Sequence, residues 1–74
     1  MNELLVLINT ILLNRGKSPI NSITDNSNLR SDFGFDSLDL AELTARIEMI
    51  YNVDIFESGI VETIGEVRQR INEK

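Results

Sequence analysis

Apolar residues recur three and four positions apart in three stretches of this 74-residue chain, the spacing that marks one face of a helix. The first stretch begins near the start of the chain and ends where Arg15 precedes Gly16, a residue type that commonly terminates helices. We therefore expect a helix from Asn2 to about Asn14, with an apolar face made of Leu4, Leu5, Ile8, Ile11 and Leu12.

The second stretch has the clearest helix start. Asp36 is a good N-cap residue, and Asp39 places a second carboxylate at the third helical position. Both favour the positive end of the helix dipole. The predicted helix runs from Ser37 to about Tyr51.

The third stretch follows a capping box, in which Thr63 is the N-cap and Glu66 stands three residues later. This last helix carries Ile64, Val67 and Ile71 at helical spacing. A weaker apolar segment from Ile55 to Ile60 precedes it. Because Gly59 interrupts this segment, we expect at most one or two turns there.

Residues Lys17 to Asp36 show no sustained period and contain Pro19 and Gly34, so they are predicted to form a long loop. The loop has spaced apolar residues that would hold it against the helices, with room for one short helical turn: Ile20, Ile23, Leu29 and Phe33. The fold class is therefore all-α. We expect a small three-to-four-helix bundle, with the long loop between helices one and two, built as one domain over residues 1–74.

The second helix has more apolar residues than one core face needs. At about 100° per residue, the core face holds Leu40, Leu43, Thr44, Ile47, Ile50 and Tyr51. The opposite side holds Leu38, Glu42, Ala45 and Met49. Isolated exposed Leu and Met side chains are common and need no function. The alternative is a docking strip framed by acidic residues, suited to transient binding of basic, grooved partners.

Composition narrows the possible chemistry. The chain has no Cys and no His, which removes disulfides, thiolate ligands, thiol nucleophiles and the usual general base. Its net charge of −5 argues against nucleic acid as a partner, and all of this charge lies from Asp36 onward. The apolar N-terminal segment has Glu3 as its first charge and is too short to span a bilayer. We expect a cytoplasmic monomer.

Ser37 lies at a corner between loop and helix, where its hydroxyl should be close to solvent. Free backbone N–H groups and the helix dipole favour a phosphate there, so a phosphoserine or a phosphodiester is chemically reasonable. A serine nucleophile is not, because no His can activate it and Lys17 has no evident tie to the site. Ser37 could also be an ordinary first-turn residue of an unmodified interaction module. An enzyme using Asp36 and Asp39 as paired carboxylates is disfavoured, because both serve the helix end.

Residues 33–43, FGFDSLDLAEL, resemble the attachment motif of the acyl carrier proteins and related phosphopantetheine-bearing carriers. The resemblance continues through Ile47-Glu48, through residues 51–55 (YNVDI) and through residues 63–67 (TIGEV). The order of the helices is similar over the whole chain.

This resemblance implies a carrier and not an enzyme. Ser37 would be modified by a phosphopantetheinyl transferase, using coenzyme A and Mg²⁺. It would then hold a phosphopantetheine arm whose thiol carries acyl groups as thioesters, so the thiol that the chain lacks would be added after translation. The second helix would be recognised by acyl-loading and acyl-transferring enzymes with basic surfaces. That role assigns partner docking to Asp36, Leu38, Asp39, Glu42, Ala45, Glu48 and Met49.

The chain also departs from the carriers of fatty-acid synthesis. The segment from Ile55 to Thr63 is shorter and contains Gly59, Ala41 and Ala45 are small, and Arg46 interrupts the acidic run. These departures favour a specialised carrier in polyketide, surface-polysaccharide or other acyl-transfer chemistry over housekeeping fatty-acid synthesis. An aminoacyl carrier of the peptide-synthetase type is an alternative, against which Phe35 argues mildly.

Overall fold

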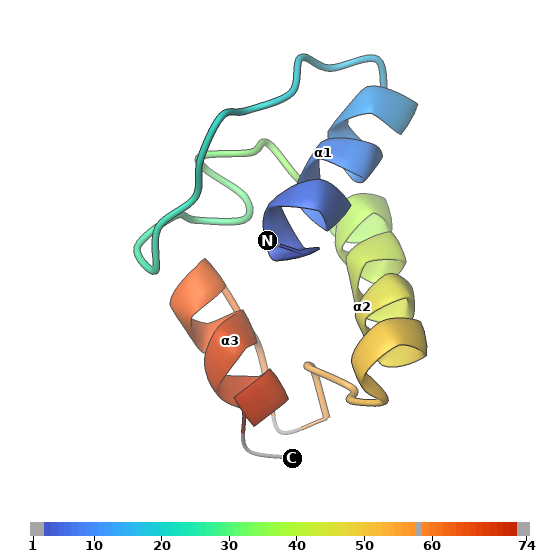
Figure 1. Ribbon diagram of the computed structural model, residues 1–74, viewed down its shortest axis with the longest axis vertical. Coiled ribbons are helices and arrows are strands. Elements are labelled where there is room, and N and C mark those ends of the chain that lie inside the picture. Colours follow the sequence, from blue (N-terminus) through green and yellow to red (C-terminus); the bar gives the residue numbers. More distant parts are fainter. Residues whose placement is uncertain (1–2, 58, 73–74) are drawn as a thin grey trace.

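Three helices make up the fold in the computed structural model, which describes residues 3–57 and 59–72. They are α1 (Glu3–Asn14), α2 (Ser37–Tyr51) and α3 (Ile64–Asn72) (Figure 1). No strand occurs among the described residues, so the predicted all-α class is confirmed. The predicted helix start at Asn2 lies outside the described residues, and residues 55–57 form turns. None of the helices described is long and apolar enough to cross a membrane.

Helices α1 and α2 lie antiparallel, and a polar side-chain contact marks each end of the pair. At one end Arg15, which directly follows α1, forms ion pairs with Asp36 and Asp39 at the start of α2. At the other end Tyr51 Oη donates a hydrogen bond to Glu3 Oε2 at 3.3 Å. The two contacts fix how far the helices overlap along their length.

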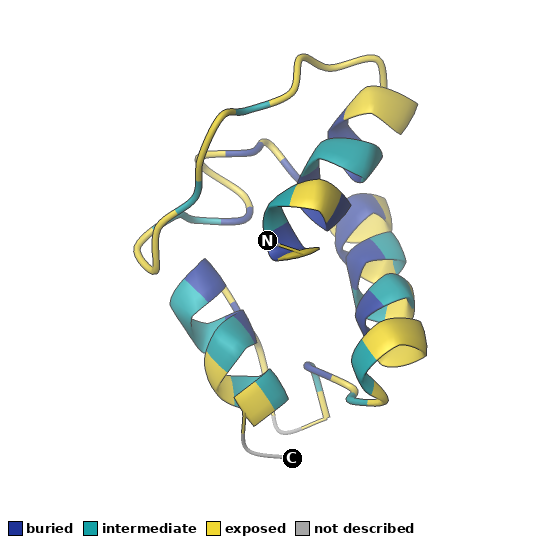
Figure 2. Cartoon of the chain, viewed as in Figure 1, coloured by how far each residue is buried: buried dark blue, intermediate teal, exposed yellow. Residues whose placement is uncertain are grey.

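A buried apolar cluster joins the three helices to the loops (Figure 2). The helices contribute Leu4, Leu7, Ile8, Ile11, Leu12, Leu40, Leu43, Ile47, Ile64 and Val67, and the loops contribute Leu29, Phe33, Phe35, Ile55 and Val61. Burying one such side chain stabilises the fold by roughly 1.5–3 kcal/mol. Apolar burial therefore supplies most of the stability, and the polar contacts described below set geometry.

Thr44 and Tyr51, expected in the core face of α2, are only partly buried, and two further positions differ from the prediction. Leu5 is only partly buried, and Leu7 is buried in its place, because the stripe of α1 that faces the core follows positions 4, 7, 8, 11 and 12. Ile50 is 52% exposed. It lies in the last turn of α2, at the edge of the core stripe.

The long loop is attached to α1 by a pair of hydrogen bonds from one side chain. The amide of Asn9 donates to Ile20 O at 2.9 Å and accepts from Ile20 N at 2.8 Å. Further along, Leu29 is fully buried and Phe33 nearly so. The predicted apolar anchoring of the loop is thus confirmed, and Ile23 also packs against the core.

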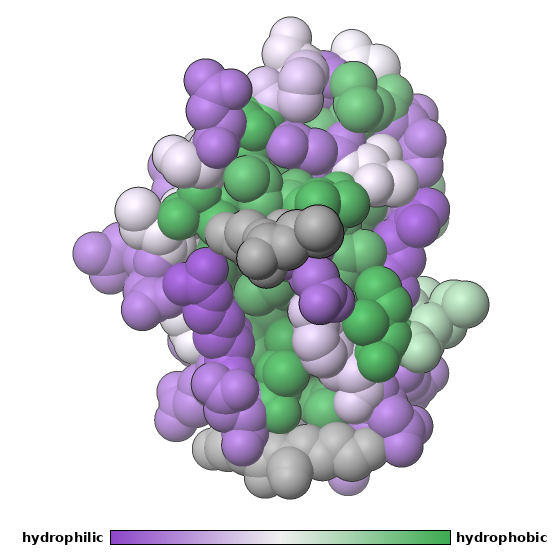
Figure 3. Space-filling model, in the orientation of Figure 1, coloured by the Kyte–Doolittle hydropathy of each residue, from purple (hydrophilic) through white to green (hydrophobic). Residues whose placement is uncertain are grey.

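The same loop holds the start of α3 through its backbone. Leu29 N donates to Glu62 O at 2.8 Å, and Gly65 N donates to Asp25 O at 2.9 Å. Arg68 Nη1 adds an ion pair to Asp25 Oδ1 at 2.7 Å. On the face shown in Figure 3, apolar side chains are visible in a furrow between α3 and the α1–α2 pair.

The predicted capping box is present at α3, and the predicted N-cap Asp36 forms a second capping box with Asp39 at α2. Asp39 N donates to Asp36 Oδ1 at 3.0 Å, and Asp36 N donates to Asp39 Oδ2 at 3.1 Å. Glu66 N donates to Thr63 Oγ1 at 3.3 Å, and Thr63 N donates to Glu66 Oε1 at 3.1 Å. Each box satisfies two backbone N–H groups that a helix start otherwise leaves without partners.

Gly65 is expected to tolerate no side chain without loss of stability. A Cβ at this position would lie 3.0 Å from Asp25 O and 3.1 Å from Asp25 Cβ, so Gly65→Ala should push the loop away from α3. We expect the free energy of unfolding in urea to fall by about 1 kcal/mol, since the crowding outweighs the gain in helix propensity. Gln69→Ala, at an exposed position of the same helix, is the control and should change it by less than about 0.5 kcal/mol. An unchanged or higher stability of Gly65→Ala would contradict this prediction.

Candidate functional site

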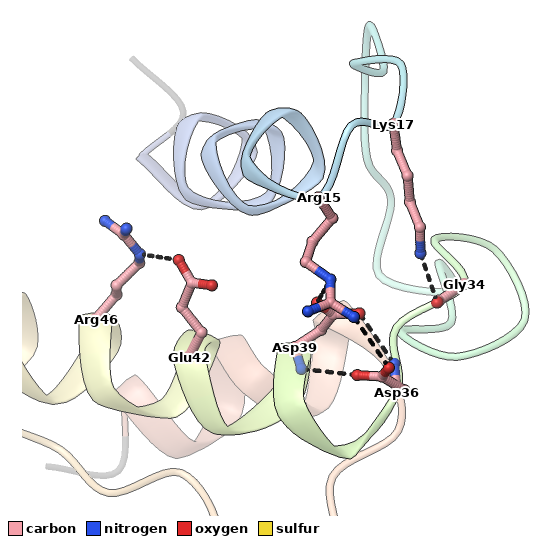
Figure 4. A network of polar contacts seen from close by, with 7 residues as sticks. All are labelled: Arg15, Lys17, Gly34, Asp36, Asp39, Glu42 and Arg46. Carbon is pink, nitrogen blue, oxygen red and sulfur yellow. Dashed lines mark hydrogen bonds and ion pairs between the residues drawn. The ribbon is translucent and has the colours of Figure 1, made fainter.

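The corner that precedes α2 is fixed by buried aromatic rings and one lysine. The rings of Phe33 and Phe35 lie 5.6 Å apart between centroids, and Phe35 is 3% exposed. Between them, Gly34 has a φ of +69°, a conformation that glycine adopts without strain. Lys17 Nζ donates to Gly34 O at 2.9 Å (Figure 4). These contacts hold the chain in position three residues before Ser37.

Ser37 is the first residue of α2, and it is exposed. The N-cap residue Asp36 has extended backbone, and its side chain accepts from Asp39 N. Within the described residues no hydrogen bond engages the Ser37 hydroxyl. The serine therefore presents an accessible oxygen at the positive end of a 15-residue helix, where backbone N–H groups and the dipole stabilise an attached phosphate.

A guanidinium bridges the two carboxylates on either side of Ser37. Arg15 Nη2 lies 3.3 Å from Asp36 Oδ2, and Arg15 Nε lies 3.1 Å from Asp39 Oδ1 (Figure 4). The Asp39 side chain is only 1% exposed, whereas that of Asp36 is 59% exposed. The buried carboxylate thus has a counter-charge and a backbone hydrogen bond, which buried charges require.

The local environment shifts the ionisation of Asp36. The pKa of its carboxyl is lowered, first because the Asp39 backbone N–H donates to it and then because Arg15 is close. The same effect acts at α3, where backbone N–H groups of Glu62 and Thr63 hold the pKa of Glu66 below its ordinary value. The carboxyl groups of Asp36 and Glu66 are consequently ionised at neutral pH.

The residues predicted to dock partners fall into two groups. Leu38 and Met49 are 64% and 86% exposed, and Ala45 and Glu48 are also exposed. The others are engaged within the protein. Besides Asp36 and Asp39, this group contains Glu42, whose Oε2 accepts from Arg46 Nε at 2.9 Å.

Asp39 was expected on the outer surface, and that expectation is wrong. Its side chain turns toward Arg15 and is buried, because it completes the capping box with Asp36 and pairs with the end of α1. It cannot offer a charge to a partner in this conformation.

Two basic residues of the site were missed from the sequence. Arg15 had been considered only as a helix-end signal, and Lys17 as a residue with no tie to the site, yet both contact the segment that carries Ser37. They lie 17 to 24 residues from their partners, so the periodicity of a single helix cannot predict these contacts.

The helical fold with an exposed serine at the start of α2 is the arrangement expected of a small covalent carrier. Comparison with known proteins specifies which kind: the family model described as "Phosphopantetheine attachment site" matches residues 6–71. The chain belongs to this family. No solved structure matches it.

Two relatives are acyl carrier proteins by name. The acyl carrier protein of Saccharopolyspora erythraea is 33% identical over 69 residues, which cover 90% of this chain and 73% of the relative. The acyl carrier protein of Phytoplasma australiense is 38% identical over 53 residues, which cover 72% of this chain and 70% of the relative. The chain is thus an acyl carrier protein family member, a carrier and not an enzyme, and its cofactor is phosphopantetheine. This role requires a phosphopantetheinyl transferase and acyl-handling enzymes as partners.

Removal of the Arg15 charge should destabilise the fold. Arg15→Gln leaves the buried Asp39 carboxylate without its counter-charge, so we expect the free energy of unfolding to fall by about 1–3 kcal/mol. The control is Arg46→Gln, which removes a half-exposed guanidinium from an i,i+4 pair and should cost about 0.5 kcal/mol or less. Equal losses in urea denaturation would contradict a special role for Arg15.

The lowered pKa of Asp36 predicts a pH-dependent contribution to stability. Its folded-state pKa lies below the ordinary value of 3.8, so the unfolded chain binds the proton first as pH falls. The stabilising contribution is complete above about pH 5 and is lost as pH falls through 3.8 and then through the folded-state value. Asp36→Asn, which keeps a capping oxygen, should be less stable than wild type at pH 7, and this difference should shrink by pH 3. A difference that is independent of pH would refute the assignment.

Proposed function

We propose that Ser37 is the residue to which phosphopantetheine is attached, and that the chain delivers acyl groups from this position to partner enzymes. The observation that carries the proposal is the placement of an accessible serine hydroxyl on the first residue of α2, inside the region matched by the attachment-site family. When bound, the arm supplies a thiol that holds an acyl group as a thioester.

The residues around Ser37 fit such a group. In the attachment step, Ser37 Oγ would bond to the phosphorus that carries the pantetheine of coenzyme A, the adenosine bisphosphate would leave, and the serine proton would pass to the transferase. The helix start favours the resulting phosphodiester charge. The carboxylate of Asp36 is next to this added charge. The guanidinium of Arg15 already neutralises part of the negative charge of Asp36. The apolar furrow seen in Figure 3 offers shelter for an acyl chain.

The proposed setting is a specialised acyl-transfer pathway in the cytoplasm, in preference to housekeeping fatty-acid synthesis. Support comes from the segment after α2, which forms turns at residues 55–57, and from Arg46, whose guanidinium interrupts the acidic side of α2. The aminoacyl carrier and the unmodified interaction module are the competing functions.

The test is modification in vitro. Wild-type protein incubated with coenzyme A, Mg²⁺ and a promiscuous phosphopantetheinyl transferase should gain one phosphopantetheine group by intact mass, and Ser37→Ala should gain none. Ser31→Ala is the matched control, because Ser31 is an exposed serine six positions earlier, and it should be modified like wild type. Fragment masses should place the group on Ser37. An unmodified wild-type protein would favour the interaction module.

A further inference from the structure

The charges on α2 are largely neutralised inside the protein. Asp36 and Asp39 share the guanidinium of Arg15, and Glu42 pairs with Arg46. Three carboxylates therefore face two guanidinium groups, and one of the carboxylates is buried. Glu48 is exposed and forms no ion pair with any described residue.

An apolar strip lies on the same helix. Leu38, Ala45 and Met49 are separated by seven and then four positions, which places them on one face, and all three are exposed. Leu38 directly follows Ser37. Any enzyme that reacts at the Ser37 hydroxyl must therefore come into contact with the first residue of this strip.

We infer that Arg15 and Arg46 determine which transferases accept this chain: they cancel acidic charge that a strongly basic partner would use, and they leave the apolar strip as the main contact for an apolar socket on the phosphopantetheinyl transferase. The inference rests on the proposed function and adds the kind of partner surface that the site accepts.

The physical reason is the difference between a free charge and an ion pair. A free carboxylate attracts a basic surface over about 8–10 Å at ordinary salt concentrations. A carboxylate paired at 2.9 Å, as Glu42 is with Arg46, presents to a distant cation only the weak field of two opposed charges. A basic partner would have to displace Arg46 before it could use Glu42. The apolar side chains of Leu38 and Met49 need no such exchange, because they are already exposed.

The first experiment measures the contribution of the strip. Met49→Ala should lower kcat/KM for attachment by the transferase about tenfold, the usual effect of truncating an important interface side chain. Met49 is 86% exposed, so the variant should fold like wild type. The matched control is Ile60→Ala, because Ile60 is 78% exposed but lies in the loop before α3, and its kcat/KM should stay within about twofold of wild type.

The second experiment measures the cancellation of charge, using coenzyme A and a transferase with a basic docking surface. Arg46→Gln frees Glu42, so kcat/KM at low NaCl should rise about threefold or more and return toward the wild-type value in high NaCl. Arg68→Gln changes the net charge equally. Because Arg68 pairs with Asp25 at the α3–loop junction, this control should show neither the increase nor the steeper salt dependence.

The outcomes separate this inference from the proposed function. Attachment to Ser37 that is equally fast in Met49→Ala and wild type overturns the inference alone. Equal responses of Arg46→Gln and Arg68→Gln to salt also overturn it, since total charge would then explain the rate. Wild-type protein that gains no phosphopantetheine overturns both the attachment site and the inference built on it.

Discussion

The guanidinium of Arg15 connects the end of α1, the end of the long loop and the first turn of α2. Its most demanding partner is Asp39, a carboxylate with 1% of its side chain exposed, because a buried carboxylate that loses its counter-charge destabilises the fold. Asp39 in turn accepts from the Asp36 N–H and completes the capping box that begins α2. The place of Ser37 relative to α1 therefore depends on a contact between residues that are far apart in sequence.

The net charge of the chain does not describe the charge that α2 presents on its surface. The net charge of −5 arises entirely from Asp36 onward, which suggests an acidic surface on α2. In the folded protein, Arg15 comes from the neutral part of the chain to meet two of these acids, and Arg46 meets a third within the helix. Two of the four negative charges at and on α2 are thus cancelled, and a partner encounters a more weakly acidic surface than the sequence suggests.

The elements of the fold could be predicted from local sequence, because each has a local cause. Two helix starts are indicated by pairs of residues three positions apart that contact each other: Asp36 with Asp39, and Thr63 with Glu66. The position of Ser37 at a helix start followed from the same signal. What could not be predicted depends on packing between distant segments: Asp39 is buried where Arg15 reaches it, and Lys17 contacts Gly34 across the loop. Periodicity describes one helix at a time and contains no information on these contacts.

The attachment of the loop to α1 depends on a side chain that must both donate and accept a hydrogen bond. Asn9 donates to Ile20 O and accepts from Ile20 N, and an amide is suited to do both at once. Deamidation, the slow chemical conversion of asparagine to aspartate, would remove the donor and place an anionic oxygen beside a carbonyl. The junction would then keep one bond and gain a repulsion. The chemical lifetime of a single amide group thus limits how long α1 and the long loop stay joined in this way.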